Sequence, residues 1–252
     1  MTQDFLDRIH PERGIAGFTK LDGTVTFYSF VKAIMRDMGA ARVMDFGAGR
    51  GAFFFETRSL WRRELQDLRQ YGTEVWACDP DPVVQDHPCS DHQIVIEPGK
   101  PLPMEDGFFD MIVSDVTFEH VADPAAVAEE LLRVLRPGGV ICARTPNRFG
   151  YAKLLTQIVP NSLHVRFLGV IQPGRKAEDI FPTVFKLNSV GAVKRHFPGC
   201  DVYWYRDSAE PAYYFGNSLL YRLGLFVHKL LPDVLSTSIC FFIVKRDGAA
   251  RS

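Results

Sequence analysis

Three alternating glycines preceded by an aspartate form the segment of this chain best suited to chemistry, Asp45-Phe46-Gly47-Ala48-Gly49-Arg50-Gly51. Glycine lets the backbone turn tightly and lets a ligand lie against it where a Cβ would collide. The free amide groups at the start of a following helix would point at the same place. The segment therefore predicts a ligand-binding turn between a strand and a helix.

A second acidic residue, Asp79, is expected beside this turn. It follows the apolar run Glu74–Cys78, as the glycine turn follows Arg42–Phe46. Ligands of open parallel sheets bind at the carboxyl ends of the strands, where a carboxylate can accept both hydroxyl groups of a ribose. The alternative is that Asp79 merely caps a short helix at residues 80–86.

The glycine spacing distinguishes two classes of adenosine cofactor. The dinucleotide fingerprint is G-x-G-x-x-G, whereas this chain has G-x-G-x-G with Asp45 two positions before the first glycine. A carboxylate there would repel a pyrophosphate and attract a cofactor that carries a sulfonium and an ammonium group. The turn favours a cofactor with a positive end, and a nicotinamide-linked oxidoreductase is the less favoured alternative.

Short apolar runs that alternate with helix-like segments must position these residues. Strands are predicted at residues 42–46, 74–78, 93–96, 110–114, 140–144, 202–205 and 238–244. Helices are predicted from Thr24 to a stop at Gly39, over residues 52–70, from the cap Asp123 to the stop at Pro137-Gly138-Gly139, and near residues 189–196. This alternation is typical of a parallel sheet covered by helices on both faces.

Four blocks of the chain resemble, in order, motifs of the class I S-adenosylmethionine-dependent methyltransferases of the small-molecule type. They lie at residues 43–51, 78–81, 101–121 and 132–139. The resemblance covers about residues 40–146. It implies a doubly wound α/β fold with a seven-stranded Rossmann-like sheet whose last strand is antiparallel, and S-adenosyl-L-methionine as the cofactor.

The resemblance also implies roles for individual residues. Asp45, Gly47 and Gly49 would contact the methionine side of the cofactor, and Asp79 would bind the ribose. Glu97 would stand in for the acid that relatives often place near the adenine. The further candidate contacts with the cofactor are Ala48, Pro80 and Ser114.

His120 follows the fourth predicted strand and is the candidate general base. An imidazole can accept a proton from a hydroxyl acceptor near neutral pH. A structural role in orienting its loop is equally open, and Asp115 and His164 are lesser candidates for the base. Ser114–Thr117 lacks the Asn-Pro-Pro-aromatic pattern of enzymes that methylate nucleobase amines, which argues against that substrate class. We expect O-methylation by direct in-line displacement, with nitrogen or carbon acceptors still open.

Basic residues dominate the segment after the fifth strand, and residues 147–200 are interpreted as a substrate-binding lid insertion. Between Arg144 and Lys186 there are seven basic residues (Arg144, Arg148, Lys153, Arg166, Arg175, Lys176, Lys186) and two acidic ones (Glu178, Asp179). A cationic lid would receive an anionic acceptor such as a carboxylate, a phosphate or a nucleotide-linked sugar. A solvated surface with a chance imbalance is the alternative.

The segment 217–231 is strongly apolar with a narrow polar stripe. Such a helix can dock on a membrane surface, a partner subunit or a lipid-linked substrate. The simpler alternative is a helix that packs against the sheet or the lid.

Length and composition bound the remaining possibilities. We expect one domain over residues 1–252, with a cofactor-binding core at 40–146, the lid at 147–200, and final strands with the apolar helix at 201–246. The net charge of −1 argues against nucleic acid as a partner, and no apolar run approaches the roughly 20 residues that span a bilayer. Five scattered cysteines and a polar N-terminus predict a cytoplasmic protein without a metal site. A non-catalytic interaction module stays open.

Overall fold

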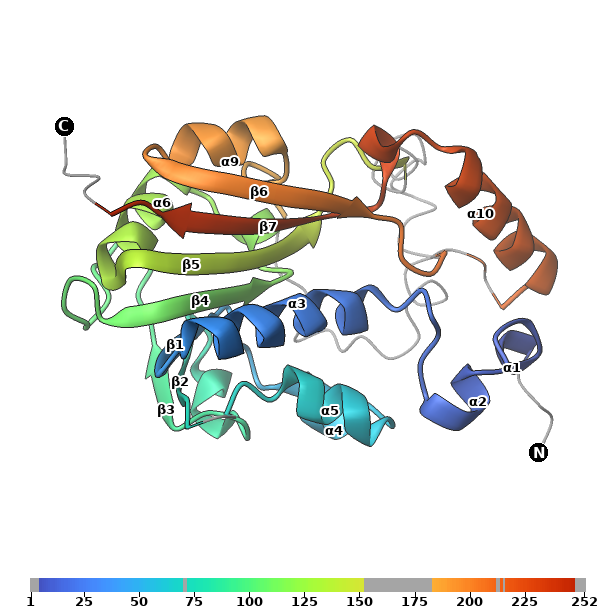
Figure 1. Ribbon diagram of the computed structural model, residues 1–252, viewed down its shortest axis with the longest axis horizontal. Coiled ribbons are helices and arrows are strands. Elements are labelled where there is room, and N and C mark those ends of the chain that lie inside the picture. Colours follow the sequence, from blue (N-terminus) through green and yellow to red (C-terminus); the bar gives the residue numbers. More distant parts are fainter. Residues whose placement is uncertain (1–4, 70–71, 152–182, 212–213, 215, 248–252) are drawn as a thin grey trace.

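Seven strands form one sheet in the order β3-β2-β1-β4-β5-β7-β6 (Figure 1). The computed structural model describes residues 5–69, 72–151, 183–211, 214 and 216–247. The strands are β1 Arg42–Phe46, β2 Glu74–Asp79, β3 His92–Val95, β4 Phe109–Asp115, β5 Leu135–Pro146, β6 Cys200–Asp207 and β7 Ser238–Lys245. The first five are parallel, and β7 runs antiparallel to both of its neighbours. The predicted seven-stranded sheet with an antiparallel last strand is confirmed.

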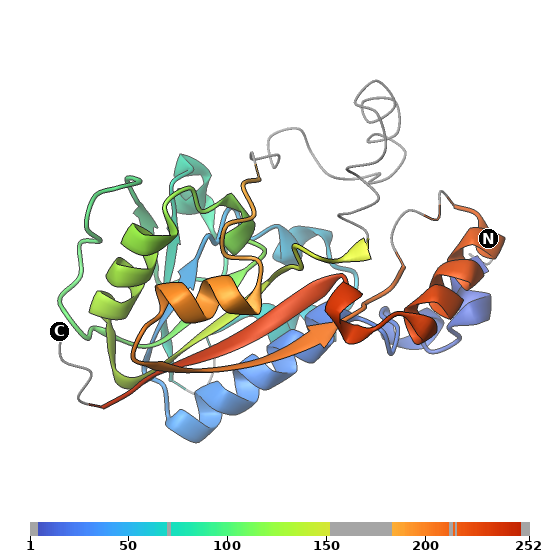
Figure 2. The same ribbon diagram turned by 90° about the horizontal axis from the view of Figure 1, so that it is seen from above.

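Helices cover both faces of the sheet (Figure 2). The α-helices are α1 Phe5–Ile9, α2 Arg13–Ala16, α3 Gly23–Met38, α4 Ala52–Glu56, α5 Leu60–Gln66, α6 Pro124–Val134, α9 Val190–His196 and α10 Ser218–Leu230. Short 3₁₀ helices are η1 Pro82–Asp86, η2 Phe118–His120 and η4 Asp233–Leu235. Along β4, Val113 packs in the core beneath α3 and Ile112 packs in the core beneath α6 and α9. This alternation in a fully buried strand produces one apolar core on each side of the sheet.

Two helices differ from their predicted extents. The stretch predicted as one helix over 52–70 is two helices, because Thr57 is extended and Ser59 caps a new helix by accepting the N–H of Arg62. Helix α6 ends at Val134, before Pro137-Gly138-Gly139, which belongs to β5. A residue that precedes proline avoids the helical region, so Arg136 favours the earlier start of the strand.

A second layer of helices lies beyond the end of the sheet, at the right of Figure 1. Helix α10 packs there on α1, and its buried Tyr221 has its hydroxyl 2.9 Å from Nε2 of His10 and its ring edge-on to Phe5. The sequence indicated α10, but it gave no sign of α1 or α2. None of the described helices is long and apolar enough to cross a bilayer.

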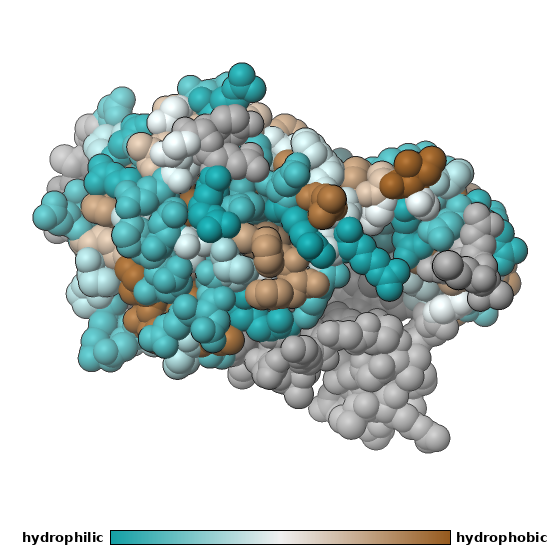
Figure 3. Space-filling model, turned by 90° about the horizontal axis from the view of Figure 1, so that it is seen from below, coloured by the Kyte–Doolittle hydropathy of each residue, from teal (hydrophilic) through white to brown (hydrophobic). Residues whose placement is uncertain are grey.

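Helices α5 and α10 both carry exposed apolar side chains. Leu60 (69% exposed) and Trp61 (53%) stand on α5, and Figure 3 shows apolar side chains over α4 and α5 on an otherwise mostly hydrophilic face. A stripe on α10 is formed by Leu219, Leu223, Phe226 and Leu230. Most of the predicted lid, residues 152–182, lies outside the described residues, and with it His164, Arg175 and Lys176.

Candidate functional site

The glycine turn connects β1 to α4, and all three of its glycines have positive φ angles. A Cβ at Gly47 would collide with the side chain of Thr117, and one at Gly51 would lie 2.7 Å from Cδ of Pro88. These two glycines are therefore required by close packing. Nothing lies within 4 Å of a Cβ built at Gly49, so its bare backbone faces open space. Such a surface is what a bound ligand needs to approach the main chain.

Asp79 joins the turn to the end of β2. Its Oδ2 accepts the N–H of Gly49 at 2.9 Å, and its Oδ1 accepts the N–H of Asp81 at 2.8 Å. Burial raises the pKa of Asp79, while the two N–H donors oppose that rise. The helix-capping role that was the alternative for Asp79 belongs to Asp81, which accepts the N–H of Val83. Each carboxylate oxygen has a second lone pair with which it can accept a ligand hydroxyl.

Asp45 stands at the base of the turn, among other negative charges. Burial raises the pKa of its carboxyl to about 7, and the charges of Asp115 and Asp79 add to the rise. Carboxylates at the ends of three neighbouring strands thus face one region. A positively charged ligand would relieve their mutual repulsion, whereas an anionic ligand would increase it.

Asp115 lies at the end of β4 and is held by Arg144 of β5. Both of its oxygens accept from the guanidinium group, each at 2.7 Å. Arg144 also donates to Oγ1 of Thr24 at 3.1 Å and so connects the strands to the start of α3. Arg144 is one of the basic residues from which a cationic lid was predicted. Its side chain, however, is only 15% exposed and forms an ion pair with Asp115 inside the fold. The bidentate pair makes Asp115 better suited to positioning these elements than to accepting a proton.

His120 ends η2, directly after β4, and its side chain is 21% exposed. Its Nε2 is 4.0 Å from Oε1 of the buried Glu119. Burial raises the pKa of Glu119, whose Oε2 accepts from the hydroxyl of Thr145 at 3.0 Å. His120 is also close enough to Asp79 to lower the pKa of that carboxyl. The structure therefore brings the predicted base to the same edge as the predicted ribose contact.

The other predicted cofactor contacts are placed differently. Ala48 donates its N–H to the carbonyl of Cys78, at 3.3 Å, and Pro80 is exposed after β2. Ser114 is fully buried, and its hydroxyl has no hydrogen-bond partner among the described residues. Glu97 is on the outer loop after β3, 66% exposed, and pairs with Lys100.

Sequence reasoning missed the contribution of the loop between β4 and η2. Val116 has a φ of 57°, which is an outlier for a β-branched residue. This conformation lets the next residue, Thr117, cover Gly47. Strained backbone of this kind gathers at functional sites, where the surrounding structure has to impose it. No pattern of residue types around Val116 indicates the strain.

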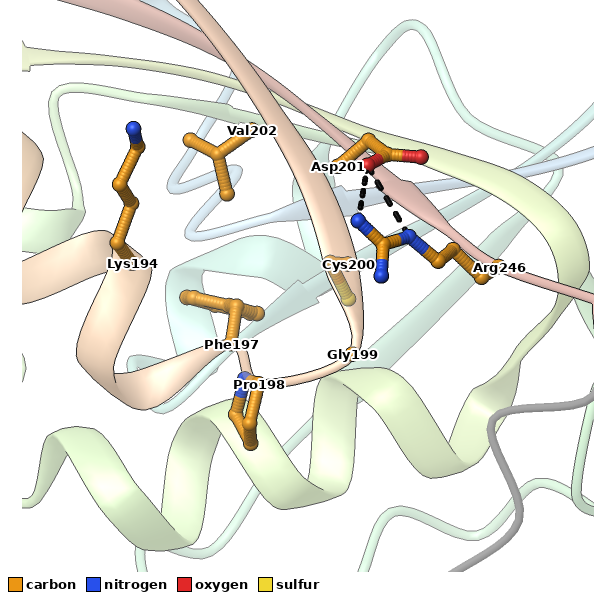
Figure 4. Close-up of a pocket in the computed structure, with 8 residues that line it drawn as sticks. All are labelled: Lys194, Phe197, Pro198, Gly199, Cys200, Asp201, Val202 and Arg246. Atoms are coloured by element: carbon orange, nitrogen blue, oxygen red, sulfur yellow. Dashed lines mark hydrogen bonds and ion pairs between the residues drawn. The ribbon is translucent and has the colours of Figure 1, made fainter.

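One surface hollow lies away from these residues (Figure 4). It measures about 470 Å³ and is lined by residues around the start of β6, including Lys194, Asp201 and Arg246. Asp201 accepts two hydrogen bonds from Arg246 there. Since β6 is parallel to β1–β5, its first residues lie at the edge of the sheet opposite to the glycine turn. This hollow is not part of the candidate site.

Comparison with known proteins shows similarity to methyltransferases. Residues 44–143 match the family model described as "Methyltransferase domain". The chain is 35% identical over 106 residues to an uncharacterized methyltransferase of Mycobacterium sp. (strain KMS), which covers 40% of this chain and 37% of that protein. It is 26% identical over 124 residues to human thiol S-methyltransferase TMT1B, covering 45% of this chain and 46% of the relative. The matched stretch thus spans less than half the length of each of these relatives.

Solved structures extend the similarity in fold over most of the chain. The plantazolicin methyltransferase BpumL, in complex with SAH, superposes with a TM-score of 0.51 at 12% sequence identity. The superposition covers 88% of this chain and 83% of that one. At this identity the similarity concerns the fold alone.

Proposed function

This chain carries a class I S-adenosylmethionine-dependent methyltransferase domain, and from that premise we propose that it transfers a methyl group to a small-molecule or glycan acceptor. The observation that carries the proposal is the open backbone at Gly49, joined through its N–H to Asp79. This open backbone at the carboxyl ends of parallel strands supports the proposal, because ligands of such sheets bind there.

The residues at this edge fit S-adenosyl-L-methionine. The bare backbone of Gly49 leaves room for the ligand, and Asp79 is placed to accept the hydroxyl groups of a ribose. Asp45 supplies a carboxylate for a positively charged group. When bound, this cofactor supplies an electrophilic methyl group on a sulfonium. Of the two classes of adenosine cofactor, a nicotinamide dinucleotide fits less well, because the same carboxylates would repel its pyrophosphate.

We further propose that the acceptor atom is oxygen and that His120 removes its proton. The imidazole is partly exposed, and its Nε2 lies 4.0 Å from Oε1 of the buried Glu119. An imidazole at the end of β4 can take a proton directly from a hydroxyl acceptor. Direct displacement then depends mainly on holding donor and acceptor in line. Because one relative is named for thiol methylation, the acceptor pool for screening includes thiols as well as alcohols.

The predicted compartment and partners belong to the same proposal. All five cysteines are free thiols, which supports the reducing cytoplasm expected from the sequence. No nucleic acid partner is proposed. For the exposed stripe of α10 we propose contact with a membrane surface, because Leu219, Leu223 and Phe226 recur at helical spacing beside the cations Arg222 and Lys229.

Calorimetric titration with S-adenosylhomocysteine tests the cofactor site. We expect Asp79→Ala to weaken binding at least tenfold, because it removes the anchor of Gly49 together with the ribose contact. Asp86→Ala, an exposed acid at the end of η1, is the matched control and should bind as the unmodified protein does. A folded protein that binds neither S-adenosylmethionine nor S-adenosylhomocysteine at millimolar concentration would refute the proposal.

Two rival functions give different results in the same assay. A nicotinamide-linked oxidoreductase would bind NADH and ignore S-adenosylhomocysteine. A non-catalytic module would bind S-adenosylhomocysteine but transfer no labelled methyl group to any member of the acceptor pool. Transfer to one acceptor class, lost in Asp79→Ala, distinguishes the proposed enzyme from both.

A further inference from the structure

Four cationic side chains line a second hollow of about 360 Å³, on the side of the molecule that carries α9. They are Arg148 after β5, Lys186, Arg195 of α9 and Arg206 of β6. Among the described residues that line the hollow, none is an aspartate or a glutamate. We propose that this hollow is an anion-binding subsite and that it holds a phosphate group of the methyl acceptor.

The hollow lies at the functional edge of the sheet. Asn147 directly follows β5, and Arg206 is the last residue but one of β6. Both strands run antiparallel to β7 and hence parallel to each other and to β1. Their carboxyl ends therefore lie at the same edge as Asp45 and Asp79. The hollow shown in Figure 4 lies at the opposite edge and is not a candidate for this role.

A buried polar network connects the hollow to the loop of His120. The carboxylate of Glu119 accepts from Thr145, whose hydroxyl in turn accepts from Nδ2 of Asn188 at 2.6 Å. The carbonyl of Asn188 accepts the backbone N–H of Arg148 at 2.9 Å. These hydrogen bonds fix the loop of Arg148 to the loop of the candidate base. A group bound by Arg148 would therefore be held in a constant position relative to that loop, which is what an acceptor site needs.

The cations retain donors for a ligand. The Nε atom of Arg206 is buried and has no hydrogen-bond partner among the described residues, which is uncommon for a buried donor. Lys186 donates to the carbonyl of Ala122 at 2.6 Å, and an ammonium group has three donors in all. The side chain of Arg195 is exposed at the rim. An oxyanion in the hollow could accept from the exposed groups of Lys186 and Arg195 and would reduce the repulsion among the four positive charges.

The number of charges favours phosphate over carboxylate. Guanidinium groups bind both kinds of oxyanion in a bidentate manner. A carboxylate carries one negative charge, whereas a phosphate monoester or a diphosphate carries two or more and has more acceptor oxygens. Four cations around one hollow of this size therefore match a phosphorylated compound best. The assignment of this group to the methyl acceptor rests on the proposed function, but the binding of the anion does not.

Calorimetry with inorganic pyrophosphate, phosphate and acetate at constant low ionic strength tests the subsite. We expect pyrophosphate to bind most tightly and acetate least. Arg195→Gln and Arg206→Gln should each weaken pyrophosphate binding about tenfold, as expected for the loss of one charge-assisted contact. Lys194→Gln is the matched control, because it removes the neighbouring charge of the same helix, which lines the hollow at the opposite edge. Binding in this control should be unchanged.

Several outcomes would overturn the subsite. These are an absence of saturable pyrophosphate binding, equal weakening in Lys194→Gln, or acetate binding as tight as that of phosphate. If Arg206→Gln disturbs folding, Arg195→Gln still tests the subsite, because Arg195 is exposed and its replacement should leave the fold intact. Titration of the same variants with S-adenosylhomocysteine separates the two proposals. Loss of pyrophosphate binding with normal S-adenosylhomocysteine affinity concerns the subsite, whereas failure of the unmodified protein to bind S-adenosylhomocysteine refutes the proposed function alone.

Discussion

Asp45, Asp79 and Asp115 lie at or near the carboxyl ends of β1, β2 and β4. Their surroundings differ. Asp115 is neutralised by the two hydrogen bonds from Arg144. Asp79 accepts two backbone N–H groups, which orient it without adding a full positive charge. Burial and the neighbouring carboxylates raise the pKa of Asp45 to about 7. The uncompensated negative charge therefore belongs to Asp45 and Asp79, which is where a cationic ligand gains most.

The raised pKa of Asp45 predicts a pH dependence of ligand affinity. With a pKa of about 7, the carboxyl is protonated in the free protein at lower pH, and a ligand with a positive end must displace that proton. Affinity for S-adenosylhomocysteine should fall up to tenfold per pH unit below about 7 and level off above it. In Asp45→Asn the affinity should be lower, and this dependence should disappear. Calorimetry between pH 5.5 and 8 checks the prediction, and an equal slope in the variant would contradict it.

His120 is predicted to act in the chemical step and not in cofactor binding. Replacement of His120 by Asn should lower kcat by about 10²-fold or more, the usual contribution of a general base, and leave S-adenosylhomocysteine binding in place. The acceptor found in the screening provides the assay. If the histidine only orients its loop, His120→Asn lowers the melting temperature and weakens cofactor binding, while kcat changes little. That result would return the role of base to the remaining candidates.

The types of the site residues and their order along the chain could be predicted from the sequence. The residues that contact them in the folded protein could not. The glycine turn and Asp79 were recognised because tight turns and strand ends have a local composition. Asp115 and Arg144 are 29 positions apart, and Thr117 approaches Gly47 over 70 positions. Such pairs depend on the order of the strands in the sheet. A single sequence carries no local pattern for that order.

At the scale of elements, capping residues decide where helices begin. Asp22, Asp123 and Ser189 cap α3, α6 and α9, and each accepts at least one backbone N–H of the first turn. The break between α4 and α5 escaped prediction because Ser59 is followed by good helix formers and resembles an interior position. The strand β5 begins early because Leu135 pairs with Phe109, a contact between distant segments.

The exposed stripe of α10 predicts binding to anionic vesicles. Leu219, Leu223, Phe226 and Leu230 would insert into the interface, and Arg222 and Lys229 would attract the headgroups. Co-sedimentation with vesicles of phosphatidylcholine and phosphatidylglycerol should show bound protein. The double variant Leu223→Asp/Phe226→Asp should stay in the supernatant.

Leu60→Asp/Trp61→Asp is the matched control for this experiment. It places the same two charges on exposed apolar side chains of α5, away from the stripe. Binding in this control should equal that of the unmodified protein. Unmodified protein that stays in the supernatant, or equal loss of binding in all variants, would exclude α10 as a membrane contact.

At the scale of the whole molecule, the sheet brings together residues from distant parts of the chain. The alternation of apolar runs and helices predicted its class and the approximate positions of its seven strands. The placement of β6 outside β7 depends on pairs such as Tyr203 with Phe242, which no local pattern encodes. The packing of α1 on α10 is a similar case, since Tyr221 contacts Phe5 and His10, which are more than 200 positions away in the chain. The extent of the domain stays a prediction.

Because the candidate cofactor contacts Asp45, Asp79 and Ser114 come from β1, β2 and β4, ligand binding should stabilise the whole fold and not one loop. A ligand that binds only the native state adds about 2.7 kcal/mol at 100 times its Kd. For a chain of this length that increment corresponds to a rise of roughly 5–10 °C in Tm. Thermal unfolding with saturating S-adenosylhomocysteine should show this rise in the unmodified protein and in Asp86→Ala.

Asp79→Ala makes the same measurement specific to the site. At the same ligand concentration its Tm should rise by clearly less, because a tenfold weaker Kd removes about 1.4 kcal/mol of the stabilisation. The Tm of the variant without ligand serves as its own baseline, so a loss of intrinsic stability does not imitate the effect. An equal ligand-induced rise in Asp79→Ala would mean that S-adenosylhomocysteine binds elsewhere. The glycine turn would then have to be explained by packing alone, with Thr117 over Gly47 and Pro88 against Gly51 as its reason.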